Sequence, residues 1–195
     1  MYMRHSFITP QKDSAANMIR LKKQFPDLPA DTIQASKKIF ITPCNHAIGD
    51  QMDAIVCGID FSGLGISEGK SNSSLLLLAL ATVMQYVEYL PDTQAAEATG
   101  TRMDWKYALH LPVHFPGLEP ATLREFREAL IADQKGLQVF QCLLDHFTET
   151  GFLGSRGQQQ VKAFDVLVAL CSLNRLTQLV EAMSRVIEAL AANQT

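Results

Sequence analysis

The last quarter of the chain carries a long apolar repeat that no helix breaker interrupts. Residues 158–195 contain neither proline nor glycine. Apolar residues recur there at alternating intervals of three and four positions, at Val166, Ala169, Leu173, Leu176, Val180, Met183, Ile187 and Leu190. This is the a/d heptad pattern, so it predicts one long amphipathic helix that packs against another helix, in this chain or in another copy.

The later part of the repeat is predicted to be an association element. A large apolar side chain that leaves water stabilises the packed state by roughly 1.5–3 kcal/mol. The residues expected to form an oligomer interface are Leu173, Leu176, Val180, Met183, Ile187 and Leu190. The alternative is that residues 162–190 pack back on residues 75–90 of the same chain.

Capping residues and prolines predict several helices between residues 71 and 153. Ser73 or Ser74 begins a helix that reaches Leu90 and stops at Pro91. Two short helices are expected at 92–99 and 101–110, with Gly100 as the terminator between them, and their spacing is that of a helix-turn-helix.

Two further helices are expected after a proline-rich loop. One begins around Pro120, because proline is tolerated at the first helical position. It carries Leu123, Phe126 and Leu130 on one face, and the next helix spans about 136–150. The predicted fold class is therefore mainly α, a compact multi-helix domain followed by one long amphipathic helix.

Residues 1–70 are only weakly assigned by their pattern. Short helices are expected over 14–25 and 31–38, and a strand over 38–42. A glycine-rich stretch and a serine-rich loop place a boundary near residue 70. The predicted organisation is thus an N-terminal segment at 1–70, a helical domain at 71–153 and the long helix at 158–195.

Composition indicates a soluble globular protein of a reducing compartment. Hydrophobic residues make up 47%, charged residues 19%, and the net charge is −3, so charge alone does not indicate a nucleic-acid-binding domain. The four cysteines form no CxxC pair, which favours the cytoplasm. The longest apolar run, 75–84, is too short for a bilayer span of about 20 residues, so no membrane partner is expected.

No catalytic, metal or cofactor site is predicted from spacing. His110 and His114 are four apart, but Pro112 between them breaks a helical ligand pair. Both are expected to be solvated loop histidines. Cys44 and His46 lack two further ligands nearby, and phosphate-binding glycine motifs are absent from the sequence.

Basic residues alternate with aromatic residues in two places, which suggests a nucleic-acid surface. The four candidate DNA contacts are Arg102 and Lys106, near Trp105 and Tyr107, and Arg124 and Arg127, on either side of Phe126. The alternative is a pair of amphipathic helices whose Trp105 and Phe126 are core and whose arginines are solvated. In both interpretations Arg124 and Arg127 lie outside the apolar face, so the fold should survive their removal.

Several stretches resemble the N-terminal domain of bacterial insertion-sequence DDE transposases of the InsH-like type. They are residues 78–86 and 90–98, Met103-Asp104-Trp105-Lys106-Tyr107-Ala108-Leu109, Pro116-Gly117, Leu123-Arg124-Glu125-Phe126-Arg127 and Leu173-Asn174-Arg175-Leu176. The resemblance covers about 61–191. It implies a helical region that binds transposon ends, ahead of an RNase H-like domain whose carboxylates hold two metal ions.

The chain departs from the family where catalysis would begin. Lys162 stands where the resemblance places the first catalytic acid, and a lysine cannot ligate magnesium. The sequence also stops before the later acids would appear. These departures predict a truncated, catalytically inactive transposase fragment.

Three functions follow as hypotheses. The first is weak, salt-sensitive binding of transposon-end DNA, with a slope of about −2 to −4 in log K against log salt for four cations. The second is an interaction module that dimerises, or pairs with a full-length transposase as an inhibitor. The third is a decayed remnant with no selected role.

Overall fold

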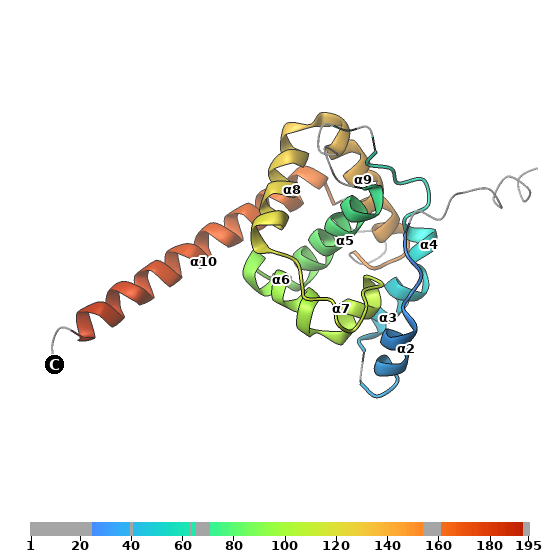
Figure 1. Ribbon diagram of the computed structural model, residues 1–195. Coiled ribbons are helices and arrows are strands. Elements are labelled where there is room, and N and C mark those ends of the chain that lie inside the picture. Colours follow the sequence, from blue (N-terminus) through green and yellow to red (C-terminus); the bar gives the residue numbers. More distant parts are fainter. Residues whose placement is uncertain (1–24, 40, 63, 65–70, 154–160, 193–195) are drawn as a thin grey trace, which may run out of the picture.

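The chain folds into helices throughout the part that the structure describes. The computed structural model describes residues 25–39, 41–62, 64, 71–153 and 161–192, and within these ranges it contains no strand. The helices are α2 (Ala30–Ser36), α3 (Pro43–Asp50), α4 (Met52–Ile55), α5 (Asn72–Glu88), α6 (Asp92–Thr101), α7 (Met103–Ala108), α8 (Pro120–Ala132), α9 (Gln134–Glu149) and α10 (Ala163–Ala192). Helices α2 to α9 gather in one body, and most of α10 projects from it (Figure 1). The predicted mainly α fold with a long C-terminal helix is confirmed.

Helix α5 runs through the body and is apolar on nearly every side. All residues from Leu78 to Gln85 are buried, and α6, α8 and α10 pack against this helix. A helix that is hydrophobic all round belongs in the interior. Its N-cap is Ser71, whose hydroxyl accepts a hydrogen bond from the Ser74 amide at 3.2 Å, so the helix begins slightly before the predicted start.

Helices α8 and α9 follow their sequence patterns closely. Pro120 opens α8, and Leu123, Phe126 and Leu130 are all buried, as predicted. Helix α9 begins after Asp133, whose carboxylate accepts a hydrogen bond from the Lys135 amide at 3.0 Å. Helix α8 begins where a proline takes the first helical position, and helix α9 begins where Asp133 caps it; an apolar stripe then runs along each helix.

The region before residue 70 contains helices that its pattern did not predict. Helix α3, capped by Thr42, and helix α4 replace the aperiodic stretch, whereas α2 matches the expected helix at 31–38. The expected strand over 38–42 was wrong, since the described residues there are turn and coil. The helix expected over 14–25 lies almost wholly outside the described residues.

Residues on both sides of position 70 share one hydrophobic core. Met52, Ile55 and Phe61 are buried in the same cluster as Leu76 and Phe126, and the Phe61 and Phe126 rings meet edge to face at 6.1 Å. Helix α3 packs on α7, far along the chain. The short early helices are therefore stabilised by tertiary packing rather than by their own periodicity.

Gly100 lies inside α6 and does not terminate it, so that prediction was wrong. A Cβ atom at this position would lie 2.6 Å from the Pro116 carbonyl oxygen. Gly117, with a φ of +108°, approaches the same turn of α6 from the loop. The glycine is required because the backbone of the proline-rich loop touches the helix here.

The two short helices do not present a DNA-reading surface. In a helix-turn-helix, the second helix places exposed side chains in the major groove. Here the second helix is α7, its residues from Trp105 to Ala108 are buried, and it packs against α2, α3 and α6. The helix-turn-helix expectation is corrected accordingly: α7 is an internal helix of the body.

Replacing Gly100 by alanine tests the close approach. Alanine is favoured over glycine inside a helix by about 1 kcal/mol, yet we expect Gly100→Ala to lower the free energy of unfolding by roughly 1–3 kcal/mol through overpacking. Gln94→Ala, at an exposed position of the same helix, is the control and should not destabilise. Urea denaturation measures both, and a stabilised Gly100→Ala variant would contradict the packing.

Candidate functional site

The first candidate DNA contact, Arg102, is held by two carboxylates of its own chain. Its guanidinium pairs with Glu88 and lies 2.5 Å from the Asp104 carboxylate. Trp105 Nε1 donates to the same Glu88 at 3.0 Å. The hydrogen bond to Asp104, opposed by burial and aided by Glu88, raises the pKa of Arg102 above its ordinary value. The positive charge is thus paired with two carboxylates of the same chain, although the side chain is partly exposed.

Asp104 shows the reverse shift in this cluster. Burial acts to raise the pKa of its carboxyl, but the hydrogen bond and the charge of Arg102 outweigh it and lower the pKa. Asn45 of α3 also donates to this carboxylate at 3.0 Å. The Asp-Trp-Lys-Tyr motif that carries part of the family resemblance therefore joins α7 to α3 and α5.

The second candidate, Lys106, is buried as well. Its side chain is 4% exposed, and its Nζ donates to the backbone carbonyls of Val113 and Phe115. A lysine that satisfies the carbonyls of an irregular loop is a structural residue. It has no access to a phosphate in this structure.

Arg127 is the most completely buried of the four. It is 1% exposed, and its two terminal nitrogens donate to the two carboxylate oxygens of Asp92 at 2.7 and 2.6 Å. Gln85 of α5 donates to the same carboxylate at 2.7 Å. The expectation that Arg127 lies outside the core was wrong, because a carboxylate in the interior binds it there as a bidentate pair.

Asn174 of α10 completes this buried cluster. Its side-chain oxygen accepts a hydrogen bond from the Asp92 amide at 2.7 Å, and its nitrogen donates to the Leu170 carbonyl at 2.8 Å. Helix α6 has no side-chain cap of its own, since its N-cap is Pro91. A residue of α10 thus supplies the cap and fixes where α10 leaves the body.

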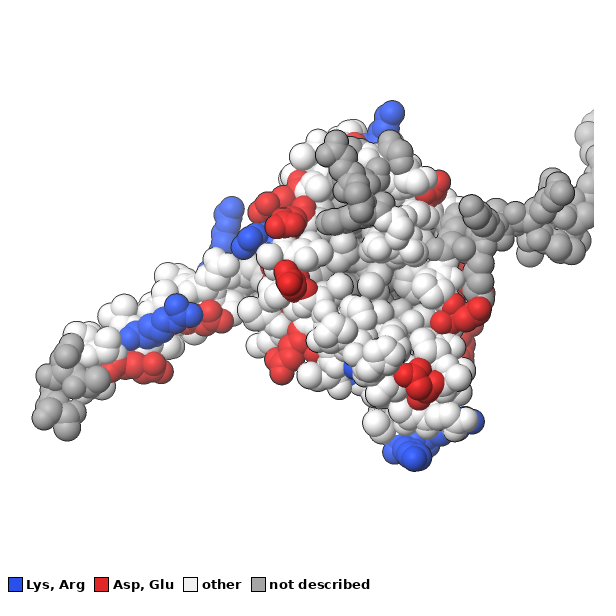
Figure 2. Space-filling model, viewed as in Figure 1, with Lys and Arg blue, Asp and Glu red and all other residues white. Residues whose placement is uncertain are grey.

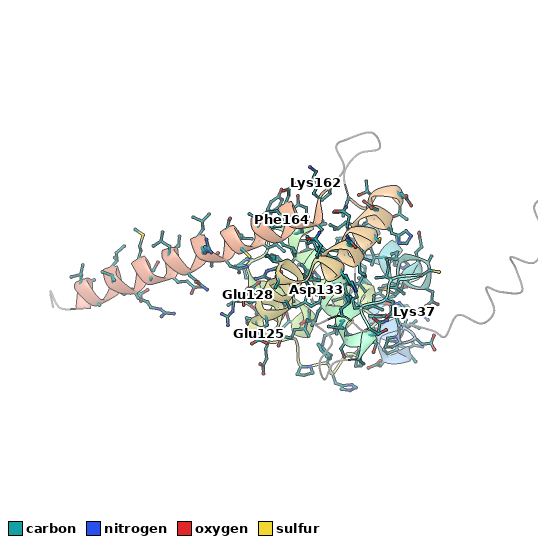
Figure 3. The ribbon with its side chains drawn as sticks, turned by 90° about the horizontal axis from the view of Figure 1, so that it is seen from above. Lys37, Glu125, Glu128, Asp133, Lys162 and Phe164 are labelled. Atoms are coloured by element: carbon teal, nitrogen blue, oxygen red, sulfur yellow. The ribbon has the colours of Figure 1, made fainter. Side chains whose placement is uncertain are left out.

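Arg124 alone of the four candidates is exposed. It lies beside Asp92 and Glu181 in a groove between the starts of α6 and α8 and the side of α10. Glu125 and Glu128 share the exposed face of α8 with it (Figure 3). Lysines and arginines lie in small, separate groups over the face in Figure 2 and form no continuous patch there.

The residues considered for metal or catalysis are separate from one another. Among the described residues no group of three or more histidine, cysteine, aspartate or glutamate side chains could hold a metal ion. His114 is exposed, but His110 is half-buried and bonds to the Pro26 and Gly49 carbonyls, so it is not a solvated loop residue. Lys162 lies exposed just before α10 (Figure 3).

Helix α10 uses two different faces along its length. In its first part Ala163, Val166, Leu167 and Leu170 are buried against the body, which includes α5, α8 and α9. Ala169, expected on the same seam as Val166, is exposed. The predicted seam is therefore interrupted: its start belongs to the core of this chain.

The projecting part of α10 carries an uncovered apolar face, called here the α10 stripe. Each of its seven large side chains is 56–63% exposed: Leu176, Leu179, Val180, Met183, Val186, Ile187 and Leu190. Leu173, also predicted for the interface, is half-buried at the junction. Large contiguous apolar patches of this kind mark interaction sites on soluble proteins.

Helix α10 is also long and apolar enough to cross a membrane. Within the described residues, Ala163–Ala191 meets this criterion, and 22% of its most apolar stretch is buried. Helices α5 and α6 meet it only together, as a pair bent by 112°. Isolated polar residues break the apolar runs of α10, so the heptad pattern predicted the helix but run length did not predict this property. Three charges, Glu181, Arg185 and Glu188, lie in the projecting part.

Comparison with known proteins gives no relative. No protein-family model, no curated protein and no solved structure matches this chain. The resemblance to DDE transposases therefore stays a prediction. The motifs that carry it have structural contacts in this fold: Asp92, Arg127 and Asn174 meet in one buried cluster, and Gly117 packs on α6.

Removing Arg127 tests whether it is structural. We expect Arg127→Ala to lower the free energy of unfolding by about 3–5 kcal/mol, because it leaves the Asp92 carboxylate buried without its partner. Arg124→Ala, on the exposed face of the same helix, should change it by no more than about 0.5 kcal/mol. Urea denaturation of both variants is the measurement. Equal, small effects would contradict the buried pair.

Proposed function

We propose that this chain is a protein-interaction module whose binding element is the α10 stripe. The observation that carries the proposal is the exposure of seven large apolar side chains on one projecting helix. Burial of each contributes roughly 1.5–3 kcal/mol on the ordinary transfer scale. The body holds the base of α10, and the stripe is left for a helix of another polypeptide.

The buried cluster at Asp92 supports the proposal because it orients α10. The base of the helix is fixed by the Asn174 side chain and by apolar packing of Val166 and Leu170. A rigid base reduces the conformational entropy that a partner must overcome when it binds the projecting part. The fold itself thus holds the stripe in an orientation in which a partner can bind it.

Transposon-end binding, which the resemblance implies, has narrower support. Arg102, Lys106 and Arg127 are engaged by carboxylates or carbonyls, which leaves Arg124 from the predicted set. Catalytic inactivity stays a prediction that rests on Lys162. A cytoplasmic location also stays a prediction, and it agrees with the four free cysteines.

A photo-crosslinking residue on α10 tests the interaction module. We expect p-benzoylphenylalanine at Met183, in the centre of the stripe, to give a covalent adduct with a polypeptide in cells that express the chain. The same residue at Arg185, on the opposite side of the helix, is the matched control. The adduct from position 183 should disappear when Ile187→Asp is added, because the charge disrupts the apolar contact.

Two results would contradict the module. One is the absence of any adduct from position 183. The other is equal adducts from positions 183 and 185, which would show that the contact does not depend on the stripe.

DNA binding can be tested by its salt dependence. One exposed cation in the predicted region gives an expected slope of about −1 in log K against log salt, shallower than four cations would give. Fluorescence anisotropy with a labelled DNA duplex measures it, and Arg124→Ala should abolish the slope, whereas Arg185→Ala should not. A steep slope that survives Arg124→Ala would show that DNA is contacted elsewhere.

A further inference from the structure

We infer that the partner of the α10 stripe is a second copy of this chain, bound as a parallel two-stranded coiled coil over residues 173–190. The inference rests on the proposed function, and it commits that function to one partner and one orientation. Four features favour this partner: the residue types of the stripe, the positions of the charges, the apolar area that is exposed, and the different face by which the base of α10 docks on the body.

The core positions of the stripe have the residue types of a parallel dimer. With Leu173 at position a, the next a positions are Val180 and Ile187, and the d positions are Leu176, Met183 and Leu190. In parallel coiled coils β-branched residues at a with leucine at d favour two strands. No polar residue interrupts these positions from 173 to 190.

The charges are placed so that two copies do not repel each other. In the same heptad frame Glu181 and Glu188 occupy b, Arg175 occupies c and Arg185 occupies f, so none of the four charges lies at an a, d, e or g position. The e and g positions, which face each other across a parallel pair, hold only uncharged residues: Thr177, Leu179, Ser184 and Val186. Self-pairing therefore brings no like charges together.

The area of the stripe suits a dimer of modest size. At about 25 cal/mol per Å² the usual gain for a large side chain corresponds to roughly 60–120 Å². Each of the seven side chains is already partly buried, with 56–63% of it exposed, so the stripes of two copies offer roughly 500–1,000 Å² in total. The upper end of this range meets the total of about 1,000 Å² that a specific interface needs. Apolar residues at g, Leu179 and Val186, widen the contact beyond a strict a/d seam.

Pairing does not compete with the packing of α10 on its own body. The base of the helix docks through Ala163, Val166, Leu167 and Leu170, none of which belongs to the stripe. Leu173 is half-buried against the body at the junction, so the pair depends mainly on the turns from Leu176 onward. Figure 1 shows the later turns of α10 clear of the other described helices. A second copy can thus reach the stripe without any rearrangement of the described fold.

A bilayer is the less favoured partner. The projecting part contains Glu181, Arg185 and Glu188, all within about two helical turns. Each of these charges is costly to place in hydrocarbon. Its polar face is not enriched in lysine and arginine, unlike helices that lie on anionic membranes. A coiled coil leaves these charges in water.

Sedimentation equilibrium of the purified full chain over a range of concentrations tests the partner. We expect a mass that rises from 21.6 kDa to twice that value with concentration. Val180→Asp should weaken the dimer at least about 100-fold, because each copy would bury an unpaired carboxylate. Gln178→Asp adds the same charge at an exposed f position and should leave the dimer unchanged, while circular dichroism checks the fold of both.

Disulfide trapping tests the orientation. In a background with serine at Cys57 and Cys142, Ile187→Cys should link two chains on oxidation, because a positions face each other in a parallel pair. Arg185→Cys in the same background is the control and should not link. In an antiparallel pair centred on Met183, the two cysteines at 187 lie about 12 Å apart along the helix axis and would not link.

Each outcome decides the inference. A dimer that Val180→Asp disrupts and that Ile187→Cys traps supports it. A monomer at all concentrations overturns it, and so does flotation of the monomer with phosphatidylcholine vesicles. If the protein is a monomer but position 183 still crosslinks a different polypeptide in cells, self-pairing is wrong and the interaction module is supported. If position 183 gives no crosslink at all, both self-pairing and the interaction module are wrong.

Discussion

Asp92 joins four helices in the interior of this protein through its carboxylate and its backbone amide. It accepts two hydrogen bonds from Arg127 of α8 and one from Gln85 of α5, while the amide of the same residue is capped by Asn174 of α10. Both terminal nitrogens of Arg127 are bonded, while its Nε is buried without a hydrogen-bond partner in the described part of the chain. A buried ion pair is weak evidence of net stability, but its hydrogen bonds specify geometry. Here it sets the mutual positions of α5, α6 and α8 and the direction in which α10 leaves them. The exposure of the α10 stripe depends on that direction.

Three of the four basic residues that lie near aromatic residues in the sequence have structural partners within the fold. Arg102 and Lys106 stabilise the junction of α7 with α5 and with the loop after it, and Arg127 stabilises the junction of α8 with α6. A cation in a hydrophobic neighbourhood must find a partner, and in this chain the partners are Glu88, Asp104 and Asp92. The sequence alternative that placed Trp105 and Phe126 in the core is confirmed for both residues. Its expectation of solvated arginines holds for Arg124 but not for Arg127, which is buried.

Local signals predicted the parts of the fold that local forces determine. Caps, prolines and apolar spacing placed α5, α8, α9 and α10 to within a few residues. Helices α3 and α4 were missed because they are short and owe their stability to packing on distant segments. The buried cluster was also beyond reach, since Asp92 is 35 positions from Arg127 and 82 from Asn174. The heptad repeat predicted the helix but not the change of face along it. The sequence pattern alone does not show which turns of α10 the rest of the chain will bury.

Hydrogen exchange along α10, measured at a low and a high protein concentration, tests the central claim most directly. The account predicts that amides of residues 166–174, whose turns are docked on the body, are protected at both concentrations. Amides of residues 178–190 should exchange rapidly when the protein is dilute and become protected when it is concentrated, because only a partner covers the stripe. Equal protection of both segments at both concentrations would contradict the account, since the stripe would then be covered within one chain.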